Sequence, residues 1–158
     1  MDQEERQFAM NTLRKMFIGS QLDGIKFGLS PATTYVFFMH YNDHEPDQVW
    51  LNIESKWSVY PRNTTLFPNS EEDIEDMTED ELFKLLYELR REEVIDICIG
   101  NDSPHLYITF KSGKILFLNG FHEQYECWQA GDGQAFGGEE CLVVATPGNG
   151  ISTWFPDK

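Results

Sequence analysis

The clearest pattern of apolar and polar positions lies in residues 104–120. Alternate residues of segment 106–110 are apolar, so they share one face of a strand. Residues 115–118 are all apolar, which is typical of a strand covered on both faces. The Gly-containing segment 111–113 suits a short hairpin turn. The pattern therefore predicts a β-hairpin, which we place in the middle of the main sheet.

Shorter apolar and aromatic runs predict further strands on both sides of this hairpin. They are separated by polar or Gly- and Pro-containing connections, which favours antiparallel neighbours. Segment 131–138 contains four glycines in eight positions and is predicted to be a loop. The expected strands are residues 25–27, 33–39, 49–53, 57–60, 95–99, 141–145 and 151–155.

Two segments have the spacing of amphipathic helices. In residues 3–17, apolar positions recur at helical intervals before Gly19-Ser20 ends the pattern. In the second segment, Thr78 and Glu81 form a capping-box pattern. An apolar stripe follows it at Leu82, Leu85, Leu86 and Leu89.

The order of these elements repeats along the chain. A helix followed by three or four antiparallel strands and a tryptophan occupies residues 3–60, and the same order recurs in residues 78–130. A strand pair in residues 141–155 completes the chain. The sequence predicts an α+β fold of mostly antiparallel sheets, with two main helices and an internal duplication. The length of 158 residues indicates a single domain, residues 1–158.

Composition limits the possible partners. Twenty-seven acidic residues against twelve Lys and Arg give a net charge of -15, which argues against binding to nucleic acids or to anionic membranes. The same charge favours a basic protein partner, because opposite fields steer association. The three cysteines have no metal-ligand spacing and suit reduced thiols in the cytoplasm. Residues 1–6 are acidic, so we expect no signal peptide, and no apolar run is long enough for a membrane span.

No pattern of an active site stands out. His40 and His44 flank two acids, but on a strand end and turn this spacing does not bring them together, so we expect no metal site. Cys127 has no visible base beside it, and we interpret it as a core residue. The glycine loop has no Gly-Lys-Ser/Thr for phosphate binding. We therefore expect no enzymatic activity and no cofactor.

The acidic run 71–81 is the main candidate for partner binding. It is either a solvated loop and helix start, or a polyanion mimic that fits a basic cleft. The predicted partner-binding residues are Glu71, Glu72, Asp73, Glu75, Asp76, Asp132, Glu139 and Glu140.

The four tryptophans lie on predicted strands, where a tryptophan is more often in the core than on the surface. They are Trp50, Trp57, Trp128 and Trp154.

The hairpin also resembles a known group of proteins. Residues 106–120, followed by Tyr125-Glu126-Cys127-Trp128, are similar to small bacterial immunity proteins, the cytosolic antitoxins of polymorphic or contact-delivered toxin systems. The similarity covers residues 94–130. It implies a non-enzymatic inhibitor that binds one cognate toxin and blocks its active site, and it transfers no contact residue.

Two other functions are open. The chain could be a different acidic inhibitor, such as a phage-encoded or DNA-mimic regulatory protein, which would need no toxin gene beside its own. It could also be an enzyme or small-ligand domain that uses His105, His122 and Cys127, in which case purified protein would hold a ligand or metal.

Overall fold

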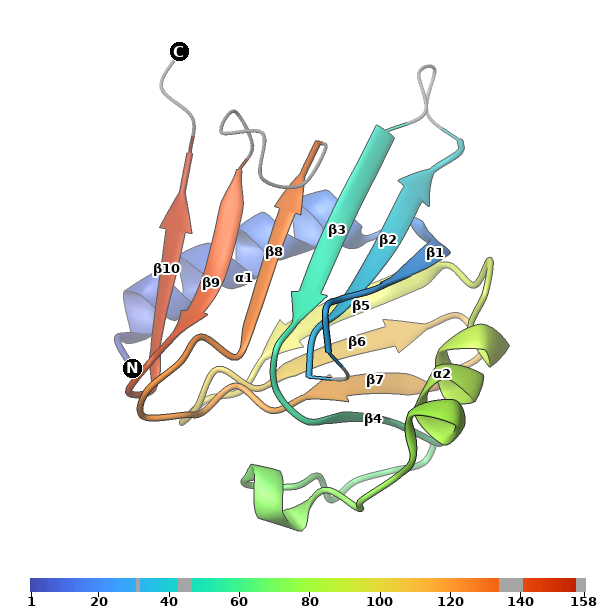
Figure 1. Ribbon diagram of the computed structural model, residues 1–158. Coiled ribbons are helices and arrows are strands. Elements are labelled where there is room, and N and C mark those ends of the chain that lie inside the picture. The colour runs from blue at the N-terminus through green and yellow to red at the C-terminus, as the bar shows by residue number, and fades with distance from the viewer. Residues whose placement is uncertain (31, 43–46, 134–140, 156–158) are drawn as a thin grey trace.

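The computed structural model describes residues 1–30, 32–42, 47–133 and 141–155 of the chain. Within these residues, two α-helices and ten strands form an α+β fold whose strands make two antiparallel sheets (Figure 1). The helices are α1 (Gln3–Phe17) and α2 (Glu79–Glu88), and a short 3-10 helix, η1 (Glu71–Asp73), precedes α2.

The larger sheet has six strands in the order β1-β2-β3-β8-β9-β10, and the smaller has four in the order β4-β7-β6-β5. The strands of the larger sheet are β1 (Gln21–Phe27), β2 (Thr34–His40), β3 (Asp47–Ile53), β8 (Trp128–Asp132), β9 (Leu142–Thr146) and β10 (Gly150–Trp154). Those of the smaller sheet are β4 (Trp57–Tyr60), β5 (Val94–Ile99), β6 (Leu106–Phe110) and β7 (Ile115–Leu118).

Both helices begin at a capping side chain, of which the sequence predicts Thr78 and the structure adds Asp2. The Asp2 side chain accepts hydrogen bonds from the backbone N–H groups of Glu4 and Glu5 at the start of α1. Thr78 accepts one from the backbone N–H of Glu81 at the start of α2. Helix α1 buries one apolar face against β5 and the larger sheet, whereas α2 buries only Leu86 within its span.

The core lies between the two sheets, whose strands cross steeply in Figure 1. The inner face of the larger sheet contributes Val36, Phe38 and Leu51, all fully buried. The smaller sheet contributes Ile108, and Phe110, which stacks against Phe38 with 6.5 Å between ring centroids. Residues 19–22 and 91–94 pair through backbone hydrogen bonds, so the starts of β1 and β5 join the two sheets.

Three expectations from the sequence are wrong. The hairpin β6–β7 occupies the centre of the smaller sheet, not of the larger one. Gly131 and Asp132 extend β8, because they pair with Trp50 and Val49 of β3. Trp154 is 64% exposed, because it lies near the end of the edge strand β10. The rest of the predicted glycine loop, residues 134–138, lies outside the described residues.

The strand topology repeats, although the helices do not. Strands β1–β3 form a meander in one sheet and β5–β7 form one in the other, and each meander pairs at its last strand with the fourth strand of the other half. These exchanged strands, β4 and β8, both begin with a tryptophan, Trp57 and Trp128. Helices α1 and α2 differ in length and surroundings, and the duplication stays a prediction.

Candidate functional site

Residues 71–76, here called the acidic ledge, lie between β4 and α2 at the lower edge of the molecule in Figure 1. The ledge begins with η1, whose backbone turns at Ser70. Ile74 is buried, which fixes the middle of the ledge to the fold. Glu72, Asp73 and Glu75 are exposed. Asp76 is exposed too, but it pairs with Lys56, so the run that the sequence singles out is an ordered surface segment with three further outward carboxylates.

Glu71 anchors the ledge through its carboxylate. Its Oε1 accepts hydrogen bonds from Ser55 Oγ at 2.6 Å and from Tyr125 Oη at 2.9 Å. Burial by itself would raise the pKa of Glu71, but the hydrogen bonds from Ser55, Tyr125 and the Lys56 backbone, together with the nearby His122, outweigh it and lower that pKa. Burial and the hydrogen bond to Glu71 raise the pKa of Tyr125 to about 12. Glu71 therefore stays ionised and Tyr125 neutral at physiological pH.

A buried asparagine, Asn119, orients Ser55 in this network. Asn119 is fully buried after β7 and donates to Ser55 Oγ at 2.7 Å and to the Phe121 carbonyl at 2.9 Å. The next residue must be glycine, because a Cβ at Gly120 would lie 1.9 Å from the Pro104 carbonyl oxygen. The end of the hairpin therefore positions both the loop 121–125 and the side chain that orients Ser55.

His105 holds the segment that leads into the ledge in place through a hydrogen bond to Asn69. Its Nδ1 accepts a hydrogen bond from the Gly120 N–H at 2.9 Å, so Nε2 carries the proton and donates to the Asn69 carbonyl at 3.0 Å. Burial lowers the pKa of His105, which keeps the ring neutral. The ring thus joins the hairpin to the residue that precedes Ser70 and the ledge.

Two hollows flank the ledge. One, of about 230 Å³, lies between the ledge and the β3–β4 connection and is also lined by Leu82 and Tyr125. The other, of about 470 Å³, lies between residues 70–72 and 121–124. Glu71 lines both hollows, so the anchoring carboxylate stands in the wall between them.

The two hollows are strongly acidic. Lys56 is the one Lys or Arg among the described residues that line them, and it forms an ion pair with Asp76. Phe121 and Tyr125 are partly exposed beside the acids, and Tyr125 stacks on His122 with ring centroids 3.5 Å apart. Acidic groups around an aromatic platform suit a partner with Lys or Arg side chains. The acids that line the hollows are Glu54, Glu71, Glu72, Glu75, Asp76 and Glu123.

The structure brings only part of the predicted site together. Glu71, Glu72, Asp73, Glu75 and Asp76 form the ledge. Asp132 ends β8 on the other side of the molecule, where its carboxylate accepts a hydrogen bond from the Cys141 N–H at 2.8 Å. Glu139 and Glu140 lie outside the described residues.

Of the three residues of the alternative small-ligand site, His105 and Cys127 are buried in the fold, and His122 lines the second hollow. Both ring nitrogens of His105 bind backbone groups, and the Cys127 thiol is buried. Burial raises the pKa of Cys127 to about 11, which disfavours a thiolate. The expectation that His40 and His44 do not form a metal site cannot be compared with the structure, because His44 lies outside the described residues. In the described part of the chain, no three His, Cys, Asp or Glu side chains are grouped to hold a metal.

Sequence reasoning missed Ser55, Asn119 and most of the loop 121–124, of which it named only His122, for the alternative small-ligand site. These residues are ordinary polar or loop residues, and their role appears only through partners far away in the chain. Tyr125 did have a signal, since it begins the Tyr-Glu-Cys-Trp segment that follows the hairpin. That segment now has a function in the fold: Tyr125 reaches the ledge and Trp128 opens β8.

The chain matches no protein-family model, no curated protein and no solved structure. The resemblance to immunity proteins therefore rests on the hairpin residues and stays a prediction. Over the described residues, no helix has the length and apolar character required to cross a bilayer.

Glu71→Gln is expected to lower the free energy of unfolding by about 1–2 kcal/mol. A neutral amide oxygen accepts the two hydrogen bonds more weakly than the charged carboxylate does. Chemical denaturation followed by circular dichroism measures this loss. The neighbouring Glu72→Gln is the matched control, since Glu72 is exposed and should change stability by less than about 0.5 kcal/mol. Equal effects of the two substitutions would contradict the anchoring role of Glu71.

Acidification is expected to destabilise the protein through His105. The folded state keeps this ring neutral with a pKa below the ordinary 6.5, so the unfolded state binds more protons once the pH falls below 6.5. Stability is therefore lost as the pH falls from about 6.5 toward the lowered pKa. The pKa of Glu71 is also lowered, so this residue adds to the loss of stability only when the pH falls below its ordinary pKa of 4.5.

Denaturant unfolding at about pH 7.5 and about pH 5.5 measures this effect. His105→Gln should lose most of the difference between the two pH values, even if it is less stable at both. His122→Gln is the control and should keep the difference. A pH dependence that survives in His105→Gln would show that another group causes it.

Proposed function

We propose that this protein is an immunity protein that binds a basic toxin domain with its acidic ledge and blocks the toxin's active site. The observation that carries the proposal is the anchoring of the ledge. Glu71, Ile74 and Asp76 are tied to the fold, while Glu72, Asp73 and Glu75 face outward between two hollows. A preordered acidic surface binds without the entropic cost of fixing a loop.

The charge of the chain supports the same partner. A net charge of -15 creates a field that attracts a basic domain, such as a nuclease or a nucleotide-using transferase, and speeds its association. Such a domain presents Lys and Arg where it binds phosphates, and these side chains complement the carboxylates of the ledge. Occlusion needs no chemistry from the inhibitor, only an interface of the standard size of about 1,600 Å².

The proposal places the protein in the bacterial cytoplasm, beside the toxin that it neutralises. The hairpin resemblance adds to the proposal independently of the ledge, because it concerns residues 94–130 and not residues 71–76. A housekeeping polymerase or nuclease as the partner would instead favour the alternative of a DNA-mimic regulator.

Deletion of the gene tests the function. Cells that lack it are expected to stop growing when the neighbouring gene encodes an intact toxin, and to grow normally when that gene is also deleted. At low salt, the tagged protein should capture the toxin domain from lysate in a one-to-one ratio. At high salt it should capture less of the domain. Normal growth of the single deletion in cells that express the captured partner would refute the immunity function.

A further inference from the structure

Three of the four sheet edges are blocked against further strands. In the larger sheet, β1 has a bulge between Leu22 and Gly24 and carries Asp23 and Lys26. In the smaller sheet, β4 is only four residues long and ends before a proline. Edge strand β5 is covered by α1, whose Arg6 and Arg14 donate hydrogen bonds to its carbonyl groups.

Over its described residues, the fourth edge, β10, has no bulge and no charged side chain. Its five residues pair with β9 in regular register. On the outer face, Trp154 is 64% exposed. On the helix side, Phe155 is 56% exposed and contacts Phe8 of α1 edge to face. Such an edge is a template for strand addition.

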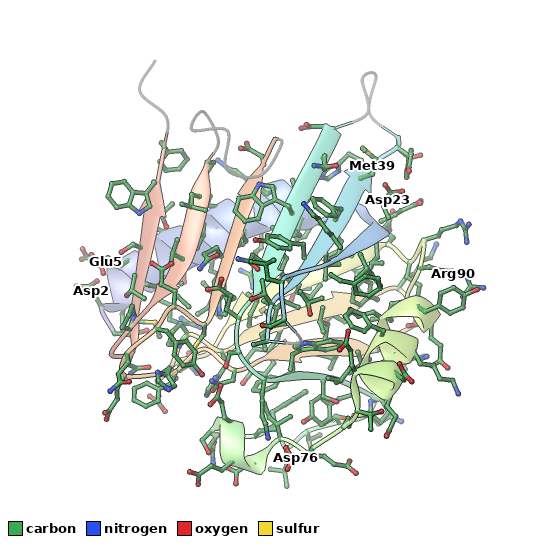
Figure 2. The ribbon with its side chains drawn as sticks, viewed as in Figure 1. Asp2, Glu5, Asp23, Met39, Asp76 and Arg90 are labelled. Carbon is green, nitrogen blue, oxygen red and sulfur yellow. The ribbon has the colours of Figure 1, made fainter. Side chains whose placement is uncertain are left out.

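A hollow runs along this edge. It has a volume of about 230 Å³ and is lined by residues 151–154 together with Glu5 and Phe8. An added strand would therefore meet exposed aromatic side chains on both faces and a concave surface between them. Figure 2 shows Glu5 at the N-terminal end of α1, on the β10 side of the molecule, far from Asp76 of the ledge.

We propose that β10 pairs with β10 of a second copy of this chain, antiparallel and about a two-fold axis at Ser152. This register places each Trp154 directly opposite Gly150 of the other copy, and Ile151 opposite Thr153. Directly opposite residues share a face, so the indole covers the position that has no side chain. The two six-stranded sheets would form one continuous sheet.

Self-pairing suits β10 for two reasons. The register puts no charge opposite a charge of the same sign, although each chain has a net charge of -15. The exposed parts of Phe8, Trp154 and Phe155 amount to roughly 400 Å² per copy, so these three side chains by themselves would supply about half of the area that each partner buries in a standard interface. Repulsion between the two acidic chains should weaken this dimer at low salt and salt should strengthen it.

The dimer is independent of the proposed function. Strand β10 and the ledge lie on different sides of the molecule in Figure 1, so pairing leaves both ledges accessible. Dimerisation is measured on the protein alone, so its failure says nothing about toxin binding. The opposite salt dependence also separates the two associations.

Sedimentation equilibrium of the full chain from about 1 to about 200 µM tests the proposal at low and high salt. The expected mass approaches twice 18.4 kDa at high concentration, and at lower concentration when salt is added. A mass of one chain under all these conditions overturns the proposal.

A charge exchange tests the two-fold axis. Ser152→Glu and Ser152→Lys each place two like charges opposite each other, so each variant alone should be monomeric. An equimolar mixture should form heterodimers, because Glu then lies opposite Lys. Circular dichroism shows whether both variants are folded. If the wild type dimerises but the mixture stays monomeric, pairing about Ser152 is wrong.

A truncation tests the contribution of the exposed indole. Trp154→Ala should weaken dimerisation at least about 10-fold, as expected for a large aromatic side chain that an interface buries. Tyr87→Ala is the matched control, since Tyr87 is 59% exposed on α2, away from β10. Equal dimerisation of Trp154→Ala and wild type would overturn the proposed packing.

Discussion

Replacing Trp128 with alanine is expected to lower the free energy of unfolding by about 3–5 kcal/mol. Trp128 is fully buried, and it is the first residue of β8, which joins strands β9 and β10 of the larger sheet to β3. Its Nε1 donates a hydrogen bond to the Pro104 carbonyl at 2.8 Å. The substitution therefore leaves both a cavity and an unpaired buried carbonyl group.

Urea unfolding followed by circular dichroism measures this loss without relying on tryptophan fluorescence. Trp128→Phe helps to separate the two contributions, because it keeps most of the apolar volume but removes the hydrogen bond, whose loss should cost about 1–2 kcal/mol. Trp154→Ala at low protein concentration is the control and should cost less than about 1 kcal/mol, since that side chain is mostly exposed. A small effect at Trp128 and a large one at Trp154 would contradict the described packing.

Neutralising the outward carboxylates of the ledge is expected to weaken toxin binding about 10- to 100-fold. The three side chains are exposed, so their replacement should leave the fold intact while removing the charges that face the partner. Biolayer interferometry with the captured toxin domain measures the change, which should reside partly in the association rate. The variant combines Glu72→Gln, Asp73→Asn and Glu75→Gln.

A control variant changes the total charge by the same amount elsewhere. It neutralises three exposed acids on α1, β3 and α2, so the long-range field falls equally while the ledge is unchanged. This variant should lose less than about 5-fold in affinity. Equal losses in the two variants would mean that net charge, and not the ledge, determines binding. The control combines Glu4→Gln, Asp47→Asn and Glu88→Gln.

Local patterns were enough to predict most of the elements. The span 3–17 of α1, the capping residue Thr78 and both arms of the hairpin follow from periodicity and turn chemistry, which act over a few residues. Pairing with a neighbouring strand extends an element beyond its own pattern: β1 begins four residues before the predicted 25–27, and β8 includes Gly131 and Asp132 of the predicted loop.

Sheet membership could not be predicted in the same way. Strand β4 follows β3 after only a short connection, yet it pairs with β7 in the other sheet. Strand β8 likewise leaves the hairpin and pairs with β3. Both exchanges depend on how two layers pack, which the alternation within one strand does not specify. The hairpin therefore looked central to the main sheet and lies in the smaller one.

The candidate site was likewise predicted only where it depends on local sequence. The acids of the ledge stand out as a run in the sequence, but their anchoring depends on contacts between distant residues. Ser55 and Tyr125, which bind Glu71, lie 16 and 54 positions from it in the chain. Asp132 looked equivalent by charge, yet β8 carries it to the far side of the molecule.

The most direct test of the acidic ledge as an immunity site is a survival assay. Cells that express the captured toxin domain receive the wild-type protein, the ledge variant or the charge-matched control at equal levels. The proposal predicts that wild type and control restore growth and that the ledge variant does not. Full protection by the ledge variant would contradict the site, and a lack of protection by the wild type would contradict the immunity function itself.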